Sequence, residues 1–500
     1  MEILSLMPAM QEPIRFYHRG AVQTVSDTPA TRTVLQYLRE DVHCTGTKEG
    51  CAEGDCGACT VVIGELQDGQ LKLQTVNSCI QLLPALDGKA LFTVEDLKQA
   101  DGTLHPVQQA MVDCHGSQCG FCTPGFVMSL WDLYLRSDGV PPQRQEIVDA
   151  LSGNLCRCTG YRPIIDAARR MCELPPARFD RQALAAALES LERDSMFSHE
   201  ANGRHFYAPR TLAELVAVRA ANPNACMLAG STDVGLWVTK QMRDLGDIIY
   251  IGQVAELKSV RESDGILEIG AAVTLNDAYA AICKHYPGEL QEMWQRFASR
   301  PIRNAGTLGG NVANGSPIGD SMPWLIALGA EVVLHGKNGD KSGRRTLPLE
   351  NFYLAYQKKD MRPDEFVEAV RVPLPRPGIR FRTYKLAKRF DQDISAVCAA
   401  FAFHLDGDLI LAARIAFGGM AATPQRAAHT ETAVKGKLWS EATLDQAIAA
   451  LEQDYTPLTD MRASGHYRMQ AAQNLLRRFW LETRSHAPLP GEAVNAFANA

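Results

Sequence analysis

Long apolar runs are missing from this 500-residue chain, and no stretch of about 18 consecutive apolar residues is present that could span a membrane. The first twenty residues contain Glu2, Pro8, Glu12 and Pro13 where a signal peptide needs an apolar core. Neither sign of charge dominates, because 51 lysines and arginines stand against 57 aspartates and glutamates, for a net charge of -6. Without a basic excess, a protein that coats nucleic acid is disfavoured. We therefore expect a cytoplasmic protein with no membrane and no nucleic-acid partner.

Two common nucleotide-binding motifs are also absent. The sequence has neither a Walker A motif nor a G-x-G-x-x-G fingerprint, so a P-loop site and a Rossmann dinucleotide site both lack support. Hydrophobic residues make up 46% and charged residues 22% of the chain, which excludes wholesale disorder. At about 100–200 residues per domain, the length predicts three or four domains.

Cysteine is present in quantity but is unevenly distributed. Of the 14 cysteines, 11 lie in residues 44–172. In a long cytosolic chain, clustered cysteines bind metal or carry redox chemistry more often than they form disulfides. The N-terminal third is therefore the expected redox region.

A first set of cysteines has the spacing C-x4-C-x2-C, followed by a fourth cysteine after nineteen intervening residues. Its members are Cys51, Cys56, Cys59 and Cys79. This is the plant-type spacing for a [2Fe–2S] cluster. Gly50, Gly54 and Gly57 would let backbone N–H groups turn toward the sulfurs. A zinc site is the alternative, but zinc favours C-x2-C pairs.

A second set consists of two close pairs, Cys119 with Cys122 and Cys156 with Cys158. Taken alone, these pairs also fit a tetrahedral zinc site or a thioredoxin-like redox pair. Beside the first set they predict a second cluster and an electron relay. The remaining cysteines are expected to be small buried hydrophobes: Cys44, Cys114, Cys172, Cys226, Cys283 and Cys398.

Hydrophobic periodicity divides the N-terminal half into three parts. Residues 13–92 read as short strands around one helix, with Thr31 as its expected cap. Residues 106–172 have helical periodicity, which predicts a bundle. An alanine-rich helix at 184–191 and the polar segment 195–203 are expected to form a connection.

In the C-terminal half, strands and helices alternate after Tyr207. Two apolar strands are expected at 399–405 and 409–417, and the residues 406–408 between them are typical of a hairpin turn. Amphipathic helices are expected at about 442–452 and 461–482.

Two glycine-containing segments predict a pyrophosphate site. In the first, a strand runs into a glycine turn and a helix expected over 234–242, so backbone N–H groups and the hydroxyls of Ser231 or Thr232 can meet an anion. The second segment, 304–320, contains five glycines and three asparagines and predicts a surface of backbone donors; a long flexible loop is the alternative.

Together these motifs resemble the iron–sulfur and flavin chain of the two-subunit xanthine dehydrogenases of bacteria, in the molybdenum hydroxylase family. The stretches that carry the resemblance are 54–60, 118–125, 154–163, 307–311, 316–320, 391–394 and 417–421. The family implies an α+β multidomain protein. Its parts would be a β-grasp plant-type ferredoxin domain at 13–94, a helical-bundle [2Fe–2S] domain at 100–173, a linker at 174–200, a vanillyl-alcohol-oxidase-type FAD-binding domain at 201–376, and a C-terminal α+β domain like that of the CO dehydrogenase flavoprotein at 380–486.

The resemblance also implies residue roles. Two [2Fe–2S] clusters would use the eight cysteines above, and Gln118 would lie near the pterin of a partner. FAD would contact Met227, Leu228, Ala229, Gly230, Ser231, Thr232, Asp233, Val234, Phe297, Thr307, Leu308, Gly309, Gly310, Asn311, Asp320, Val367 and Lys385. Phe297 would stack on the isoalloxazine, and 391–394 would form a loop on the nicotinamide side. From sequence alone, Phe297 is equally well an ordinary core residue and Lys385 a solvated charge.

The function that the family implies is electron transfer in the oxidation of hypoxanthine to xanthine to urate. Electrons would come from molybdopterin in a large partner subunit, within an α2β2 assembly, and would leave through FAD to NAD+. No residue of this chain would be catalytic in the hydroxylation itself. A different substrate, of aldehyde, aromatic or CO type, is one alternative. An iron–sulfur redox sensor is another, although a sensor has no use for a pyrophosphate site.

Overall fold

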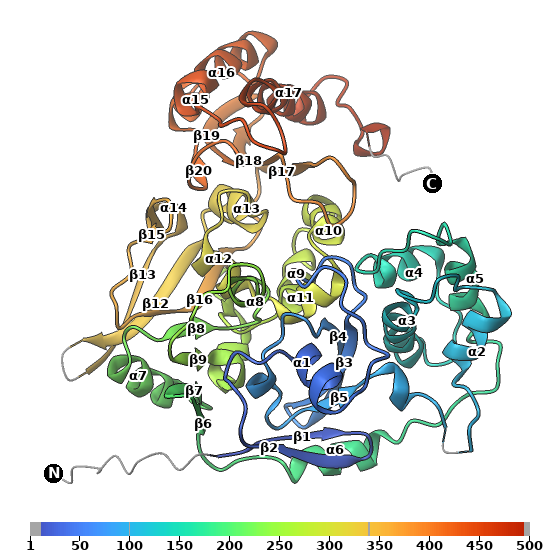
Figure 1. Ribbon diagram of the computed structural model, residues 1–500. Coiled ribbons are helices and arrows are strands. Elements are labelled where there is room, and N and C mark those ends of the chain that lie inside the picture. The colour runs from blue at the N-terminus through green and yellow to red at the C-terminus, as the bar shows by residue number, and fades with distance from the viewer. Residues whose placement is uncertain (1–11, 100, 339–340, 495–500) are drawn as a thin grey trace. The chain divides into compact units, whose positions relative to one another are not determined.

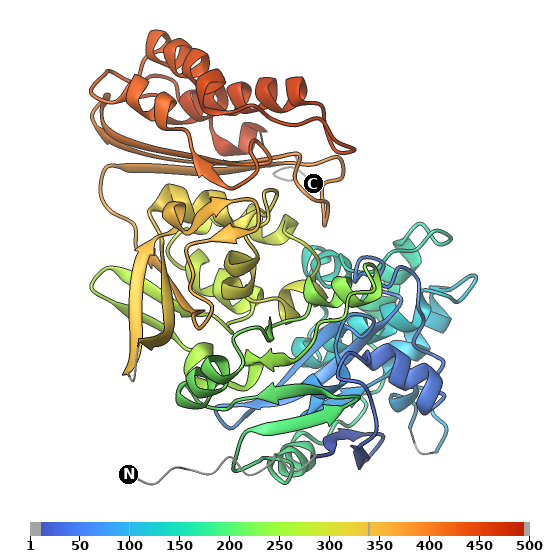
Figure 2. The same ribbon diagram turned by 60° about the vertical axis from the view of Figure 1, so that its left-hand side comes forward.

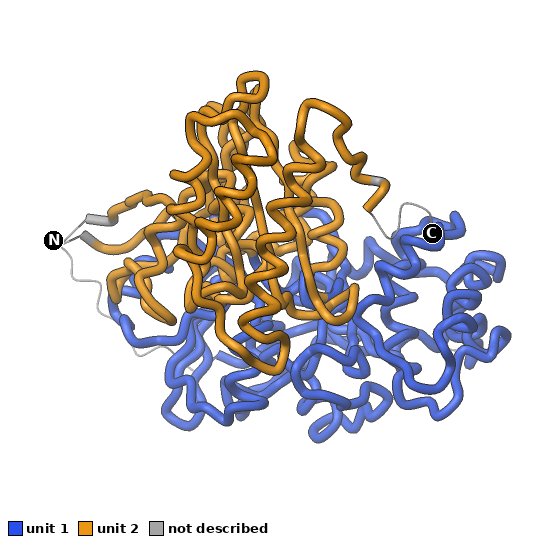
Figure 3. Tube along the Cα trace, turned by 90° about the horizontal axis from the view of Figure 1, so that it is seen from above, with its two compact units in different colours: residues 1–256, 299–307 blue, residues 257–298, 308–500 orange. Residues whose placement is uncertain are grey.

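The computed structural model describes residues 12–99, 101–338 and 341–494 (Figure 1). These residues form two compact units (Figure 3). The first contains the described residues up to Glu256 together with Ser299–Thr307, and the second contains Leu257–Ala298 and the described residues from Leu308 onward. The expected FAD-binding range 201–376 therefore contributes to both units.

The first sheet has the strand order β2-β1-β5-β3-β4. Its strands are β1 (Ile14–His18), β2 (Ala21–Val25), β3 (Thr60–Gln67), β4 (Gln70–Asn77) and β5 (Ala90–Phe92). Strands β1 and β5 are parallel and the other neighbours are antiparallel, which confirms the predicted β-grasp fold. Asp68 and Gly69 both have positive φ, as a two-residue hairpin turn between twisted strands requires.

The helix of this domain begins two residues later than expected. Helix α1 (Val34–Gln36) starts at Thr33, whose side chain accepts from the backbone N–H of Gln36, and a π-helical turn at Tyr37–Asp41 follows. Thr31 as the cap is therefore wrong. The Gln36 side chain accepts in return from the N–H of Thr33, and this reciprocal capping box selects the position.

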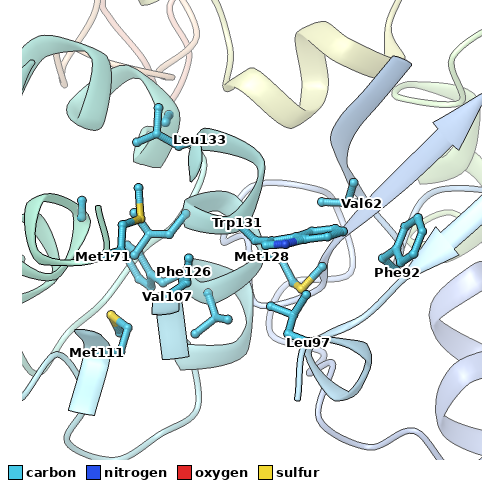
Figure 4. Packing of buried hydrophobic residues seen from close by; sticks show 14 of the residues in the cluster. Val62, Phe92, Leu97, Val107, Met111, Phe126, Met128, Trp131, Leu133 and Met171 are labelled. Atoms are coloured by element: carbon cyan, nitrogen blue, oxygen red, sulfur yellow. The ribbon is translucent and has the colours of Figure 1, made fainter. Parts of the chain in front are cut away.

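The predicted helical domain is present and shares its core with the ferredoxin sheet. Its helices are α2 (Pro106–Asp113), α3 (Thr123–Ser137), α4 (Arg144–Leu151) and α5 (Arg162–Arg170). Figure 4 shows Trp131 of α3 between the helices and the sheet, where its ring centroid lies 5.3 Å from that of Phe92. The predicted helix at 184–191 is α6 (Arg181–Glu189), and Leu184 and Leu188 enter the same core.

The segment expected to be an irregular connection over 195–203 instead contains a strand. The strands of this next sheet are β6 (Phe197–Ala201), β7 (Arg204–Ala208), β8 (Cys226–Leu228) and β9 (Ile248–Tyr250), in the order β6-β7-β9-β8, with helices α7 (Leu212–Ala221) and α8 (Val234–Thr239). Phe197 and Phe206 pack in one core with Ile14 and Phe16 of the ferredoxin sheet. This apolar burial explains why the otherwise polar segment is ordered. Helix α8 is shorter than predicted and ends at Thr239.

A short helix from later in the chain completes the first unit. Helix α11 (Arg300–Ala305) lies against β4, where the Asn304 amide donates to the backbone oxygen of Thr75 at 2.9 Å.

The second unit contains an antiparallel sheet in the order β10-β11-β16-β12-β13. Its strands are β10 (Val260–Ser263), β11 (Ile266–Gly270), β12 (Glu331–Asn338), β13 (Lys341–Pro348) and β16 (Phe366–Pro373). The small pair β14 (Tyr353–Ala355) and β15 (Lys358–Lys359) adjoins it. The accompanying helices are α9 (Leu275–Cys283), α10 (Pro287–Arg296), α12 (Leu308–Asn314), α13 (Ser321–Leu328) and α14 (Leu349–Phe352).

The last sheet has the order β17-β18-β19-β20. It consists of β17 (Ile379–Leu386), β18 (Val397–Asp406), β19 (Leu409–Gly418) and β20 (Gln425–Arg426) and is followed by α15 (Ala428–Val434), α16 (Glu441–Asp454) and α17 (Gly465–Thr483). Figure 2 shows these three helices on one face of the sheet. The predicted hairpin is confirmed, and the last helix begins after Ser464, which caps it, rather than at residue 461.

Among the residues that the structure describes, no helix is both long enough and apolar enough to cross a membrane.

Candidate redox-cofactor sites

The first cysteine set gathers at the end of the β3–β4 hairpin. Cys51, Cys56 and Cys59 come from one loop, and Cys79 follows β4. The Sγ atoms of Cys59 and Cys79 lie 3.3 Å apart. The backbone N–H groups of Asp55 and Cys56 point at the sulfur of Cys51, at 3.3 and 3.4 Å. The loop and the residue after β4 therefore place four thiols at this end of the hairpin, and the loop supplies N–H donors to the Cys51 sulfur.

The four sulfurs fall into two pairs. A hydrogen bond shared with the Cys56 thiol lowers the pKa of Cys51 to about 5, and a hydrogen bond shared with Cys79 lowers the pKa of Cys59. Among the described residues, no three His, Cys, Asp or Glu side chains converge as a single metal ion requires. A binuclear cluster instead takes two thiolates on each iron, which is the arrangement that these two pairs offer. The residues fit a [2Fe–2S] cluster.

The second cysteine set lies at the N-terminus of α3 and in the loop between α4 and α5. Cys122 shares a hydrogen bond with Cys156, and Cys119 shares one with Cys158, so this set is also paired. Burial raises the pKa of Cys122 to about 12, whereas the hydroxyl and N–H of Thr159 donate to Cys156 at 3.2 and 3.5 Å. Cys119 and Cys158 are exposed. The second site is thus the more accessible of the two.

The loops that carry the two cysteine sets are in direct contact. The backbone N–H of Leu155 donates to the carbonyl oxygen of Cys56 at 3.0 Å. Gly57 has φ +71°, and a Cβ there would lie 2.1 Å from the carbonyl oxygen of Gly153. Only glycine permits this approach of one backbone to the other.

The predicted pyrophosphate turn follows β8, as the sequence indicates. Ser231 has φ +62° and is buried, and its Oγ has no hydrogen-bond partner among the described residues. A Cβ at Gly230 would lie 1.8 Å from the carbonyl oxygen of Ala305 on α11. A buried hydroxyl without a partner is costly unless a ligand meets it, so the turn fits an anionic group such as the FAD pyrophosphate.

The same turn contacts the ferredoxin domain beside the first cysteine set. The Gln81 amide donates to the carbonyl oxygen of Gly230 at 3.1 Å, and the Thr239 hydroxyl donates to that of Ala52 at 2.7 Å. Leu236 and Ile302 pack on a small core that includes Cys59 and Cys79. Sequence reasoning did not find Gln81 or Thr239, since nothing local marks them.

The glycine-rich segment 304–320 is more regular than a donor-lined loop. Helix α11 includes Asn304, and helix α12 begins at Leu308, so Leu308, Gly309, Gly310 and Asn311 form a helical turn. Leu308 and Val312 are buried, and burial of these side chains favours the helix. The buried Oδ1 of Asn311 has no partner among the described residues, which leaves it available to a ligand.

Asp320 and Lys385 form a buried ion pair within the second unit. Lys385 Nζ lies 2.6 Å from Asp320 Oδ2 and 2.9 Å from Ser395 Oγ, and the Ser395 hydroxyl donates to Asp320 Oδ1 at 2.5 Å. Lys385 is therefore not a solvated surface charge. Burial, followed by the Asp320 charge, raises the pKa of Cys398 well above its usual range. Ser395 was missed because a lone serine after a loop carries no motif.

The second unit contains Phe297, Val367 and the loop 391–394, whereas the predicted Thr307 belongs to the first unit. Phe297 follows α10, is partly buried and lies 6.0 Å from Tyr279 between ring centroids, and Val367 is buried in β16. In the 391–394 loop, Asp393 accepts from the backbone N–H of Arg389 at 2.9 Å.

The cysteines outside the two sets divide by burial. Cys44, Cys283 and Cys398 are buried, as predicted, whereas Cys114, Cys172 and Cys226 are only partly buried.

Comparison with known families identifies four successive matches. Residues 16–83 match the 2Fe-2S iron-sulfur cluster binding domain, and residues 93–169 match the [2Fe-2S] binding domain. Residues 197–375 match the FAD binding domain in molybdopterin dehydrogenase, and residues 382–483 match the CO dehydrogenase flavoprotein C-terminal domain.

Full-length relatives and solved structures agree with these matches. The chain is 33% identical to xanthine dehydrogenase of Oryza sativa subsp. japonica over 88% of its own length, but it covers only 37% of that protein. Carbon monoxide dehydrogenase from Hydrogenophaga pseudoflava superposes with a TM-score of 0.51 at 28% identity, over 55% of this chain and 94% of the other. Quinoline 2-oxidoreductase from Pseudomonas putida 86 superposes with a TM-score of 0.50 at 27% identity, over 56% of this chain and 97% of the other. The chain therefore consists of two iron–sulfur domains followed by an FAD-binding domain, of the kind found in molybdopterin dehydrogenase, and a flavoprotein C-terminal domain.

Proposed function

We propose that this chain is the electron-transfer part of a xanthine dehydrogenase. It would carry electrons from a molybdopterin centre in a partner through two [2Fe–2S] clusters and FAD to NAD+, during oxidation of hypoxanthine to xanthine to urate. The 33% sequence identity to the plant xanthine dehydrogenase supports the choice of substrate. This chain covers 37% of the length of that enzyme.

The observation that carries the proposal is the serial contact of three sites within the first unit. The loop of Cys156 is hydrogen-bonded to that of Cys56, and Gln81, two residues after Cys79, is hydrogen-bonded to Gly230 of the pyrophosphate turn. A redox sensor needs no such turn, and the match to an FAD-binding domain counts against that alternative.

We propose that the eight cysteines hold the clusters and that FAD contacts residues 227–234, Phe297, 307–311, Asp320, Val367 and Lys385. Bound clusters would carry one electron each, whereas FAD carries one or two and can pass a hydride to NAD+. The chain's own task is to hold these groups in order. Thr159 and the backbone N–H groups of Asp55 and Cys56 donate to cysteine sulfurs, and Lys385 forms an ion pair with the buried Asp320.

We further propose a large molybdopterin-binding partner in an α2β2 assembly in the cytoplasm. The exposure of Cys119 and Cys158 supports entry of electrons at the second cysteine set. Cysteines that form no disulfide, as in these two sets, persist best in a reducing compartment.

A second candidate is the same electron transfer in a hydroxylase with another substrate. The superpositions on carbon monoxide dehydrogenase and quinoline 2-oxidoreductase favour this alternative. The substrate would be chosen by the partner's pocket and not by any residue described above.

The test is xanthine-dependent NADH formation by the natively purified complex, with this chain alone as the control. NADH-to-dye reduction is recorded on both samples. We expect xanthine activity only in the complex and dye reduction in both. If the complex ignores xanthine while both samples oxidise NADH, the substrate assignment is wrong; if neither sample oxidises NADH, the flavin assignment is wrong as well.

A further inference from the structure

The contact between the two cluster-binding loops includes a continuous bonded route. Cys56 belongs to the first cysteine set, and its carbonyl oxygen accepts the N–H of Leu155, the residue immediately before Cys156 of the second set. Covalent bonds alone connect each of these cysteine sulfurs to that hydrogen bond. The route therefore contains one non-covalent step.

Asn154 fixes the geometry of this step from one side. It is 2% exposed, and its amide N–H₂ donates to the carbonyl oxygen of Gly57 at 3.1 Å and to Thr60 Oγ1 at 3.2 Å. Its amide oxygen accepts from the Ser129 hydroxyl at 2.6 Å. Both ends of the amide are thus engaged, so its orientation is determined, and it bonds the carbonyl of Gly57, the residue that follows Cys56.

The packing around Asn154 leaves no room for another group between the loops. A Cβ at Gly125 would lie 2.1 Å from the carbonyl oxygen of Gly57, and a Cβ at Gly57 would lie 2.6 Å from the Asn154 amide nitrogen. The loops consequently touch through backbone atoms, and their separation depends on the hydrogen bonds that cross the contact.

We propose that Asn154 is a positioning residue for the electron-transfer step between the two clusters, and that this step runs through the hydrogen bond from Leu155 to Cys56. The inference rests on the proposed function, since it requires both cysteine sets to hold redox-active clusters. Asn154 touches neither set's sulfurs in any contact described above; it acts through the position of the Gly57–Ala58 peptide, one residue beyond the Cys56 carbonyl that accepts from Leu155.

The test compares Asn154→Ala and Ser129→Ala with the wild-type full chain, each loaded with both clusters and FAD. Ser129→Ala removes only the bond that orients the amide. Met171→Ala is the matched control, because Met171 is fully buried in the same helical core but makes no bond to Asn154 or Gly57. For each protein we measure the iron content, and for each cluster the electron paramagnetic resonance signal and the midpoint potential. We also measure the spin coupling between the two clusters and the rate of electron exchange between them after pulsed reduction.

We expect Asn154→Ala to keep both clusters and their potentials but to slow the exchange about tenfold and weaken the spin coupling, as loss of one buried hydrogen bond allows. Ser129→Ala should act in the same direction and less strongly. The inference is overturned if Asn154→Ala changes neither quantity more than Met171→Ala does. Where Asn154→Ala fails to assemble its clusters, an unchanged exchange rate in Ser129→Ala overturns it. Absence of two [2Fe–2S] signals in the wild-type chain would instead refute the proposed function.

Discussion

At the residue scale, Lys385 and Asp320 form an ion pair that is almost completely buried in the second unit. Lys385 Nζ and Asp320 Oδ2 are 2.6 Å apart, and their side chains are 1% and 4% exposed. Removing one partner leaves a charge in an apolar interior, and this is more unfavourable than the pair itself is favourable.

Lys385→Met should therefore lower the free energy of unfolding by about 3–5 kcal/mol, because the Asp320 carboxylate loses its cationic partner and, among the described residues, keeps the Ser395 hydroxyl. Urea unfolding measures the change. Lys388→Met is the control: this exposed lysine donates to the carbonyl oxygen of Met461, and we expect a change within about 0.5 kcal/mol. Equal effects of the two substitutions would contradict a stabilising role for the pair.

The burial of His105 should make the free energy of unfolding depend on pH. It is buried at the N-terminus of α2, where its Nδ1 accepts from the N–H of Val107, and burial lowers its pKa to about 4. The unfolded chain binds a proton near pH 6.5, whereas the folded chain does so only near pH 4. Stability is therefore complete above about pH 6.5 and falls as the pH decreases toward 4.

His105→Asn keeps a capping oxygen but removes the titration. Between pH 7 and 5, the wild-type chain should lose about 2 kcal/mol more of its free energy of unfolding than the variant does. Urea titrations at the two pH values measure this difference. His43→Asn, at an exposed position, should leave the wild-type pH dependence intact, and an unchanged slope in His105→Asn would refute the assignment.

At the scale of elements, the turn after β8 depends on how closely it approaches α11. A Cβ at Gly230 would lie 1.8 Å from the carbonyl oxygen of Ala305, and rigid backbone cannot yield as a flexible side chain can. The turn and the helix must therefore separate if this glycine is replaced.

Gly230→Ala should release FAD, since the backbone of the pyrophosphate turn would move, while the iron content stays unchanged. The flavin-to-iron ratio of the purified protein measures this effect, and we expect at least about a tenfold fall. Gly288→Ala on α10 is the control, because no atom lies within 4 Å of the added Cβ. Retention of stoichiometric FAD by Gly230→Ala would show that the turn does not bind it.

At the scale of the whole molecule, all eight predicted cluster ligands lie in the first of the two compact units. A cluster that binds only the folded state adds its binding free energy to the stability of that state. Cluster binding therefore stabilises only the unit that contains the cysteines. The two units should therefore respond differently to loss of iron.

Removing iron with a chelator under anaerobic reducing conditions should lower one calorimetric unfolding transition by about 10 °C and leave the other in place. Hydrogen exchange identifies the affected transition by its peptides, which should come from residues before Glu256. Reconstitution with iron and sulfide should restore it. A parallel fall of both transitions would mean that the units do not unfold independently.

Local patterns predicted much of the fold and the sites. The hairpin at Gly407 and the helices of residues 106–172 are confirmed, because turn chemistry and apolar periodicity act over a few residues. The cap at Thr31 was wrong by two residues, since Thr31 and Thr33 are equally good caps and only Gln36 distinguishes them. Strand β6 was missed, because its order depends on burial against Phe16, far away in the chain.

The sequence by itself determined which cofactors this protein is built for, since the cysteine spacings and the glycine turn encode their ligands within short segments. Only the tertiary structure decided which residues serve those segments from a distance. Asn154 reaches the peptide of Gly57, Ser395 reaches Asp320, and Gln81 reaches Gly230. Such contacts have no sequence period, because they arise from the packing of elements that the chain order keeps apart.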